Sequence, residues 1–244
     1  MRIPRIHVPQ PLPPGSVVRL PEQAGRHLVR VLRLERGNAL RLFNGDGREH
    51  AGELHTIAAR NVTARVIEPV ADRHTESRLR VTLVQAIARG EKMDWILQKA
   101  TELGVAAIVP VVTERTEVRL AAERAERRMA HWQAVVVAAC EQCGRTLLPA
   151  ITQPRPLADW AIGLDQAAGL RLVLDPAGEM SARDLPALDR MSLVVGPEGG
   201  LSDRDLAILK GAGFLTLRMG PRILRTETAG IGALAALQAL QGDW

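Results

Sequence analysis

The feature that most constrains this chain is an alternation of short apolar runs with amphipathic segments, which begins at Leu79. Strands separated by helices favour a largely parallel α/β sheet. The expected strands lie at 79–87, 106–112, 170–176, 193–200 and 215–220, and the expected helices at 91–104, 121–143 and 227–240.

Residues 1–72 follow a different pattern. Apolar residues alternate on both sides of Asn44-Gly45-Asp46-Gly47, the turn chemistry of a β-hairpin, and a further strand is expected at 61–70. Residues 21–34 predict one short amphipathic helix. The polar stretch VADRHTESR separates the two patterns. We therefore expect a small β-rich domain at 1–72 and an α/β domain at 73–244.

The basic composition favours a nucleic-acid partner. The net charge is +5, and 29 of the 32 basic residues are arginines, whose planar guanidinium makes bidentate contacts to phosphates. Codon composition alone would also enrich arginine. Residues 1–72 contain 11 Arg against 7 Asp or Glu, so the excess charge is concentrated there. With two Phe, four Trp and no Tyr, a surface that stacks bases on aromatic rings is disfavoured, and contacts to phosphates are expected instead.

Several classes of protein are disfavoured by missing motifs. There is no G-x-S-x-G, no H-E-x-x-H and no paired Cys/His spacing, so neither a serine hydrolase nor a metal site is expected. Cys140 and Cys143 form a C-x-x-C at the end of an expected helix, and we interpret them as two reduced, packed thiols. The alternative is a redox pair or half of a metal site. No apolar run approaches the about 20 residues of a membrane span, and a cytoplasmic protein without membrane contact is expected.

Three expected strands end in unusual turns, at 174–176, 196–200 and 219–222. Ligands of parallel sheets bind beyond the carboxyl ends of the strands, so a cofactor is expected where these turns converge. The middle turn, GPEGG, fits no dinucleotide or P-loop pattern, and Glu198 would repel a phosphate. A carboxylate beside glycines suits a ligand with positive charge and hydroxyls, such as S-adenosylmethionine (SAM). The alternative is a plain turn before a helix that Ser202 and Asp205 cap.

The last expected helix begins beside two arginines. Arg222 and Arg225 precede Thr226, the expected N-cap, and Glu227 lies in the first turn. This arrangement predicts a pocket that favours anions. Alternatively, the arginines pair with Glu227 or Glu198 and only hold the loop.

LVVGPEGGLSDRD and LRMGPRILRTETAGIGALAALQ closely resemble the two C-terminal motifs of the RsmE family of SPOUT methyltransferases. RHLVRVLRL, RGEKMDWILQKATELGV and ACEQCGR extend the resemblance over nearly the whole chain. The resemblance implies a PUA-like β-barrel and a SPOUT domain, an α/β fold with a parallel sheet and a C-terminal trefoil knot. It also implies a homodimer that transfers a methyl group from SAM to N3 of a uridine in the decoding region of 16S rRNA, giving 3-methyluridine, with an assembled or assembling 30S subunit as partner.

The resemblance also implies roles for single residues. RNA phosphates would be contacted by Arg2, Arg5, Arg30 and Arg33, whereas His7 stands where the family has an aromatic residue. The cofactor cleft would consist of residues from the three turns: Leu174, Asp175, Gly196, Pro197, Glu198, Gly199, Gly200, Leu217, Met219, Gly220, Ile223, Leu224 and Thr226.

For catalysis, the uridine N3 proton must leave. Arg222 or Arg225 would stabilise the anion, and Glu227 would accept the proton directly or through water. An RNA-binding or assembly factor without catalysis is the rival hypothesis, and a SPOUT enzyme acting on tRNA is another. The apolar stripe of the last helix would serve a core or a dimer interface; it consists of Ile231, Leu234, Leu237 and Leu240.

Overall fold

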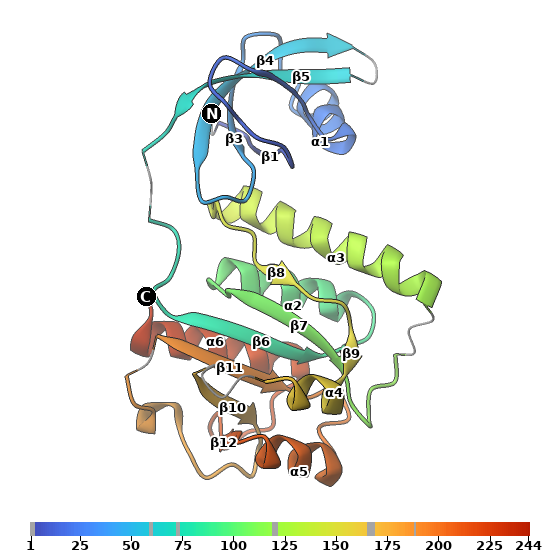
Figure 1. The fold of residues 1–244 in the computed structure, drawn as a ribbon, viewed down its shortest axis with the longest axis vertical. Coiled ribbons are helices and arrows are strands. Elements are labelled where there is room, and N and C mark those ends of the chain that lie inside the picture. Colours follow the sequence, from blue (N-terminus) through green and yellow to red (C-terminus); the bar gives the residue numbers. More distant parts are fainter. Residues whose placement is uncertain (1–2, 59–60, 72–73, 119–121, 165–168, 188) are drawn as a thin grey trace. The chain divides into compact units, whose positions relative to one another are not determined.

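The computed structural model describes residues 3–58, 61–71, 74–118, 122–164, 169–187 and 189–244. The chain forms two compact units (Figure 1). Unit 1 comprises Met1–Glu76 and Cys140–Leu148, and unit 2 comprises Ser77–Ala139 and Pro149–Trp244. The boundary expected after residue 72 stays a prediction, and no sequence pattern indicates that residues 140–148 belong with the N-terminal part. No helix among the described residues is long and apolar enough to cross a membrane.

Unit 1 is built on a five-stranded sheet with the order β1-β3-β4-β5-β2. Its strands are β1 (Arg5–His7), β2 (Val17–Arg19), β3 (Ala39–Phe43), β4 (Glu49–Ala58) and β5 (Asn61–Pro69). β3 and β4 pair antiparallel across the expected turn, where Gly45 and Gly47 both have φ near +92°, so the hairpin is confirmed. The buried core includes Leu40, Leu42, Leu54, Ala64 and Val66.

The helix expected at 21–34 is shorter than its pattern. It consists of α1 (Glu22–Arg26) and the π-helical turn η1 (His27–Val31). Leu28 packs into the unit 1 core, and Arg33, with φ of +52°, takes the chain out of helical geometry. A Cβ at Gly25 would lie 2.9 Å from Val62 Cβ, so this close approach to β5 requires a glycine.

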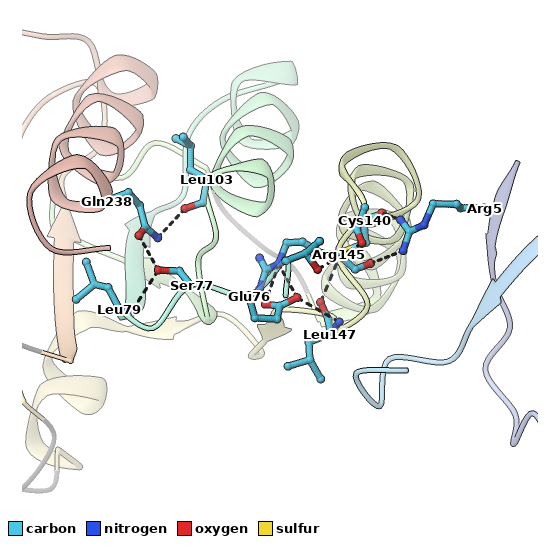
Figure 2. A network of polar contacts seen from close by, with 11 residues as sticks. Arg5, Glu76, Ser77, Leu79, Leu103, Cys140, Arg145, Leu147 and Gln238 are labelled. Atoms are coloured by element: carbon cyan, nitrogen blue, oxygen red, sulfur yellow. Dashed lines mark hydrogen bonds and ion pairs between the residues drawn. The ribbon is translucent and has the colours of Figure 1, made fainter. Parts of the chain in front are cut away.

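Arg5 ties unit 1 together from the inside (Figure 2). Its side chain is 4% exposed and its guanidinium donates to Glu49 Oε1 at 2.5 Å, to the Cys140 carbonyl, and to the Arg145 carbonyl at 3.0 Å. Arg145 in turn pairs with Glu76 at 2.6 Å. Because Arg5 is buried and its guanidinium donates to acceptors inside the unit, the structure does not support the expected contact of Arg5 with RNA phosphate. The residue anchors the end of the long helix that carries the two cysteines.

The two cysteines form no disulfide, and Cys140 is buried. Both are free, as expected, and burial raises the pKa of Cys140 to about 12 despite the opposing positive charge of Arg145. At neutral pH the Cys140 thiol therefore stays protonated, which disfavours nucleophilic or redox chemistry.

Unit 2 is built on a sheet with the order β12-β10-β11-β6-β7-β8, and β9 also pairs with β7. All of these pairings are parallel, which confirms the expected α/β class. The strands are β6 (Arg80–Ala86), β7 (Ala107–Val112), β8 (Ala150–Ile151), β9 (Arg155–Pro156), β10 (Leu170–Leu174), β11 (Arg190–Val195) and β12 (Leu215–Leu217). The helices are α2 (Glu91–Glu102), α3 (Ala122–Cys143), α4 (Leu157–Ile162), η2 (Ala182–Asp184), α5 (Asp203–Gly211) and α6 (Thr226–Gln241). The trefoil knot stays a prediction.

Alternate residues of the strands face different helices. Val84 of β6 packs in one apolar cluster with Trp160 of α4 and Leu209 of α5. Its neighbour Leu83 points to the other face, where its Cδ1 would lie 3.7 Å from a Cβ added to Gly230 of α6. Helices α4 and α5 therefore cover one face of the sheet, and α2 and α6 cover the other (Figure 1).

Helix α6 is fixed by its apolar stripe and by one buried amide. Leu234 and Leu237 are fully buried, whereas Leu240 is 51% exposed. The middle of the stripe therefore packs into the core, and its C-terminal end is exposed to solvent. Gln238 accepts from the Ser77 hydroxyl at 2.7 Å and donates to the Leu103 carbonyl at 2.9 Å (Figure 2). This bridge holds α6 to the end of α2.

Candidate active site

Unit 2 contains a cavity of about 560 Å³ at the carboxyl edge of its sheet. This volume is typical of small-molecule sites, which span about 300–1,000 Å³. The three turns after β10, β11 and β12 converge on it, together with the first turn of α6. Every residue expected from the sequence to form the cofactor cleft lines this cavity.

The three glycines of the GPEGG turn have different surroundings. Gly200 has φ of +70° with open space around it, so only the backbone conformation demands glycine. A Cβ at Gly196 would lie 3.2 Å from the Leu201 nitrogen, so there the backbone is too close. At Gly199 a Cβ would lie 3.3 Å from Arg115 Cβ, and the Arg115 guanidinium donates to the Gly199 carbonyl at 3.1 Å.

The helix after this turn begins as expected. Asp205 N–H donates to Ser202 Oγ and Ser202 N–H donates to Asp205 Oδ2, both at 3.1 Å, so the capping box is confirmed. The same segment therefore caps α5 and lines the cavity, so the alternative of a plain turn is incomplete.

Thr226 does not cap α6, contrary to expectation. The N-cap is Arg225, which has extended backbone and no side-chain capping bond. The Thr226 hydroxyl instead donates to the Gly196 carbonyl at 2.6 Å and accepts from Gln85 Nε2 at 3.0 Å. Because these partners lie on the GPEGG turn and on β6, Thr226 fastens the start of α6 to the cavity wall.

Arg222 and Arg225 both line the cavity mouth and are exposed. Within the described part of the chain, no ion pair joins either of them to a carboxylate. The alternative in which they pair with Glu227 or Glu198 is therefore not what the structure shows. Two uncompensated positive charges beside the N-terminus of a 16-residue helix make the mouth favourable for negative charge.

The described residues that line the cavity do not include Glu227. Its Oε2 atom is buried and has no hydrogen-bond partner in the described structure. The nearest cation is Lys92 of α2, whose Nζ lies 3.7 Å from Glu227 Oε2 and 3.3 Å from Glu198 Oε1. Lys92 itself lines the cavity. No role was expected for Lys92 from the sequence, although it lies within the RGEKMD stretch that carries part of the resemblance.

Glu198 is held by the backbone just before α2 and by Lys92 of α2, and not by an arginine side chain. Its Oε1 accepts from the Arg89 N–H at 3.0 Å and from Lys92 Nζ. Desolvation raises the pKa of Glu198, but the Arg89 N–H, its own N–H and the Lys92 charge together outweigh this and hold the pKa below its ordinary value. Glu198 is therefore an anion at neutral pH and brings one negative charge to the cavity wall.

Asp175, on the opposite turn, is occupied by its own backbone. Its Oδ1 accepts from the Ala177 N–H at 2.9 Å, and its N–H donates to the Leu217 carbonyl at 3.0 Å. These bonds fix the β10 turn against β12 and shape the cavity floor from main chain.

In unit 1, Arg30 and Arg33 are exposed and free to meet phosphates, whereas Arg2 lies outside the described residues. His7 is half-buried, and its ring centroid lies 5.4 Å from that of Phe43. Burial lowers the pKa of His7, partly offset by a hydrogen bond with the Asn44 backbone. The imidazole is therefore mainly neutral at neutral pH and adds no positive charge to this surface.

Comparison with known proteins agrees with this site. Residues 75–238 match the family model of an RNA methyltransferase domain, and residues 20–67 match that of an RNA methyltransferase PUA domain. A solved Legionella pneumophila protein with the bound cofactor SAM is 40% identical, with a TM-score of 0.95 and all of both chains covered. The ribosomal RNA small subunit methyltransferase E of Neisseria gonorrhoeae, bound to SAM, is 35% identical, with a TM-score of 0.91 and full coverage of both chains.

The curated relatives carry the same name. Ribosomal RNA small subunit methyltransferase E of Buchnera aphidicola (subsp. Schizaphis graminum) is 31% identical over 99% of this chain and 98% of its own. The relative from Bacillus subtilis is also 31% identical, with 89% of each chain covered. With matches of this extent in both units, the chain belongs to the ribosomal RNA small subunit methyltransferase E (RsmE) family.

Proposed function

We propose that this protein methylates N3 of one uridine in the decoding region of 16S rRNA, with SAM as the methyl donor. The observation that carries the proposal is the cavity where β10, β11 and β12 end, with two uncompensated arginines at its mouth. Family membership supports the reaction class, and the two SAM-bound relatives support the cofactor.

The cavity fits SAM in chemistry. Its apolar side chains and main-chain groups suit an adenine, because the ring needs apolar contact and a few backbone hydrogen bonds. Leu174, Leu217 and Leu224 supply apolar surface there. The Glu198 carboxylate suits a positively charged part of the ligand. When bound, SAM supplies an electrophilic methyl group.

The residues at the mouth would act on the uridine. Arg222 and Arg225 would stabilise the negative charge that forms when N3 loses its proton. Glu227 Oε2, a buried acceptor without a hydrogen bond, would take that proton. Because Glu227 lies behind the cavity lining, we assign the transfer to an intervening water.

The uridine must be unpaired or extruded, since N3 takes part in Watson–Crick pairing. Arg30 and Arg33 of unit 1 would hold the surrounding RNA through phosphates. We further propose that the substrate is an assembled or assembling 30S subunit in the cytoplasm and that the enzyme acts as a homodimer. The exposed end of the α6 stripe, at Leu240, supports an interface.

The decisive experiment is mass mapping of 16S rRNA from cells that lack this protein. We expect one 3-methyluridine of the decoding region to disappear and to return when the gene is restored. If the methyluridine is unchanged, the proposed substrate is wrong. With purified protein, failure to bind SAM at millimolar concentration would favour an RNA-binding factor without catalysis.

A matched pair of variants tests the catalytic assignment. Arg225→Ala should bind SAM as the wild type does but lose turnover by about 100-fold, which is the usual effect of removing one group that stabilises transition-state charge. Arg204→Ala, an exposed arginine of α5 outside the cavity, should keep full turnover. Wild-type turnover in Arg225→Ala would remove Arg225 from the mechanism.

A further inference from the structure

Lys92 connects the cofactor turn to the carboxylate behind the cavity. It lies in the first turn of α2, where its ammonium is 3.3 Å from Glu198 Oε1 and 3.7 Å from Glu227 Oε2. Glu198 belongs to the GPEGG turn and Glu227 to the first turn of α6. One side chain therefore spans three segments that are far apart in sequence.

The two carboxylates depend on Lys92 to different degrees. Glu198 has a second fixed donor, the Arg89 N–H at 3.0 Å. For Glu227, Lys92 is the one cation within 4.0 Å among the described residues. The Glu227 side chain is also only 18% exposed, so water screens this pair less than a surface pair. Loss of Lys92 would therefore affect Glu227 more than Glu198.

The chemistry of lysine suits this position. Of the 32 basic residues of the chain only three are lysines, and Lys92 is one of them. An ammonium is a compact charge with three donors that point in different directions, so it can serve two carboxylates on separate segments. The group of Glu198, Lys92 and Glu227 keeps one net negative charge, in contrast to the positive pair Arg222 and Arg225 at the mouth.

We propose that Lys92 is a positioning residue of the methyl-transfer site: it orients the Glu227 carboxylate toward the cavity while it fixes Glu198 on the cofactor turn. The proposal rests on the proposed function. Lys92 acts on the reaction through Glu227 and does not itself take the uridine proton. Through Lys92, the cavity wall that holds SAM is therefore linked to the carboxylate that receives the proton.

The test compares Lys92→Met with Lys99→Met. Both lysines lie on α2 and are similarly exposed, at 37% and 33%, but among the described residues Lys99 pairs only with Glu102 of its own helix, at 2.9 Å. We expect Lys92→Met to lower kcat at saturating SAM by at least about tenfold and to weaken SAM binding by about threefold, since Glu198 keeps its bonds to the Arg89 N–H and to its own N–H. Lys99→Met should change neither, and the two variants should melt within about 2 °C of each other.

A double variant separates positioning from a structural effect. If Lys92 acts through Glu227, then Lys92→Met combined with Glu227→Gln should be no slower than Glu227→Gln alone. Losses of kcat that multiply in the double variant, or an unchanged kcat in Lys92→Met, would overturn the proposal. A wild-type protein that neither binds SAM nor methylates 30S subunits would instead refute the proposed function, so the two failures are distinguishable.

Discussion

The hydroxyl of Thr226 is the smallest group whose removal tests how the cavity is held together. Thr226→Val keeps the β-branched shape and the helix propensity, and it deletes only the atom that links Gly196 to Gln85. Thr228→Val is the matched control. Thr228 lies two residues further along α6, is exposed, and makes no side-chain hydrogen bond within the described structure.

The expected loss of stability follows from the groups left without a partner. The Gln85 side chain is fully buried, and its Nε2 keeps only the Ala86 carbonyl, so the freed N–H costs about 2 kcal/mol. The Gly196 carbonyl lines the cavity, where water can replace the lost donor, and it costs about 1 kcal/mol. The new methyl group recovers about 1 kcal/mol through burial. The net loss is therefore about 2 kcal/mol for Thr226→Val, whereas Thr228→Val should stay within about 0.5 kcal/mol of the wild type.

Urea unfolding followed by tryptophan fluorescence is the suitable assay. All four tryptophans, at 95, 132, 160 and 244, belong to unit 2, so the signal reports the unit that contains the cavity. SAM binding should also weaken in Thr226→Val, because the first carbonyl of the GPEGG turn is no longer fixed. If the two variants unfold at the same urea concentration, the link from α6 to the turn does not stabilise the unit and the reasoning is refuted.

Three further substitutions test other contacts. Gly200→Ala should cost about 1 kcal/mol because of its φ of +70° alone, whereas Gly211→Ala, with equally open space but no positive φ, should be neutral or stabilising in the same urea assay; equal effects would contradict this. Gln238→Leu should cost about 2 kcal/mol by leaving the buried Leu103 carbonyl and the half-buried Ser77 hydroxyl without a partner, against less than about 0.5 kcal/mol for the more exposed Gln241→Leu. The pKa of His7 is lower in the folded protein than its ordinary value of 6.5 in the unfolded chain. As the pH falls below 6.5, the unfolded chain therefore binds a proton before the folded protein does, and the stability of the wild type decreases. His7→Phe should lose less melting temperature between about pH 7.5 and about pH 5.5, and an identical loss would argue against the buried imidazole.

Elements that depend on local pattern were predictable. The hairpin at 44–47, the strands β6, β7, β10, β11 and β12, and the capping box at Ser202 follow from residues within a few positions of one another. The connection at 144–169 was not predictable in this way: β8 and β9 have only two residues each, too few for a periodic signal, and α4 has six. The sheet edge of β7 supplies the partner that such short strands need.

The cavity shows the same division. Its three turns were predictable because glycine and proline mark the end of each strand, and parallel strands bring their carboxyl ends to one edge. The role of Thr226 was not predictable, because a threonine at the start of a helix can be either the N-cap or the first helical residue, and the sequence looks the same in both cases. Its partners, Gly196 and Gln85, are 30 and 141 residues away. The local sequence predicts a cap, but the hydrogen bonds that the Thr226 hydroxyl makes depend on residues that are distant in sequence.

The arginines of unit 1 show why residue type alone cannot assign an RNA contact. Arg5 and Arg30 occur in equally basic surroundings of the sequence, yet Arg5 is buried and Arg30 is exposed. A buried guanidinium requires a carboxylate and further acceptors, since an unpaired charge in the interior is strongly destabilising. Arg5 finds them at Glu49, 44 residues away, and at carbonyls 135 and 140 residues away. The two carbonyls belong to Cys140 of α3 and to Arg145 just after that helix, so the same contacts attach the C-x-x-C segment to the rest of unit 1.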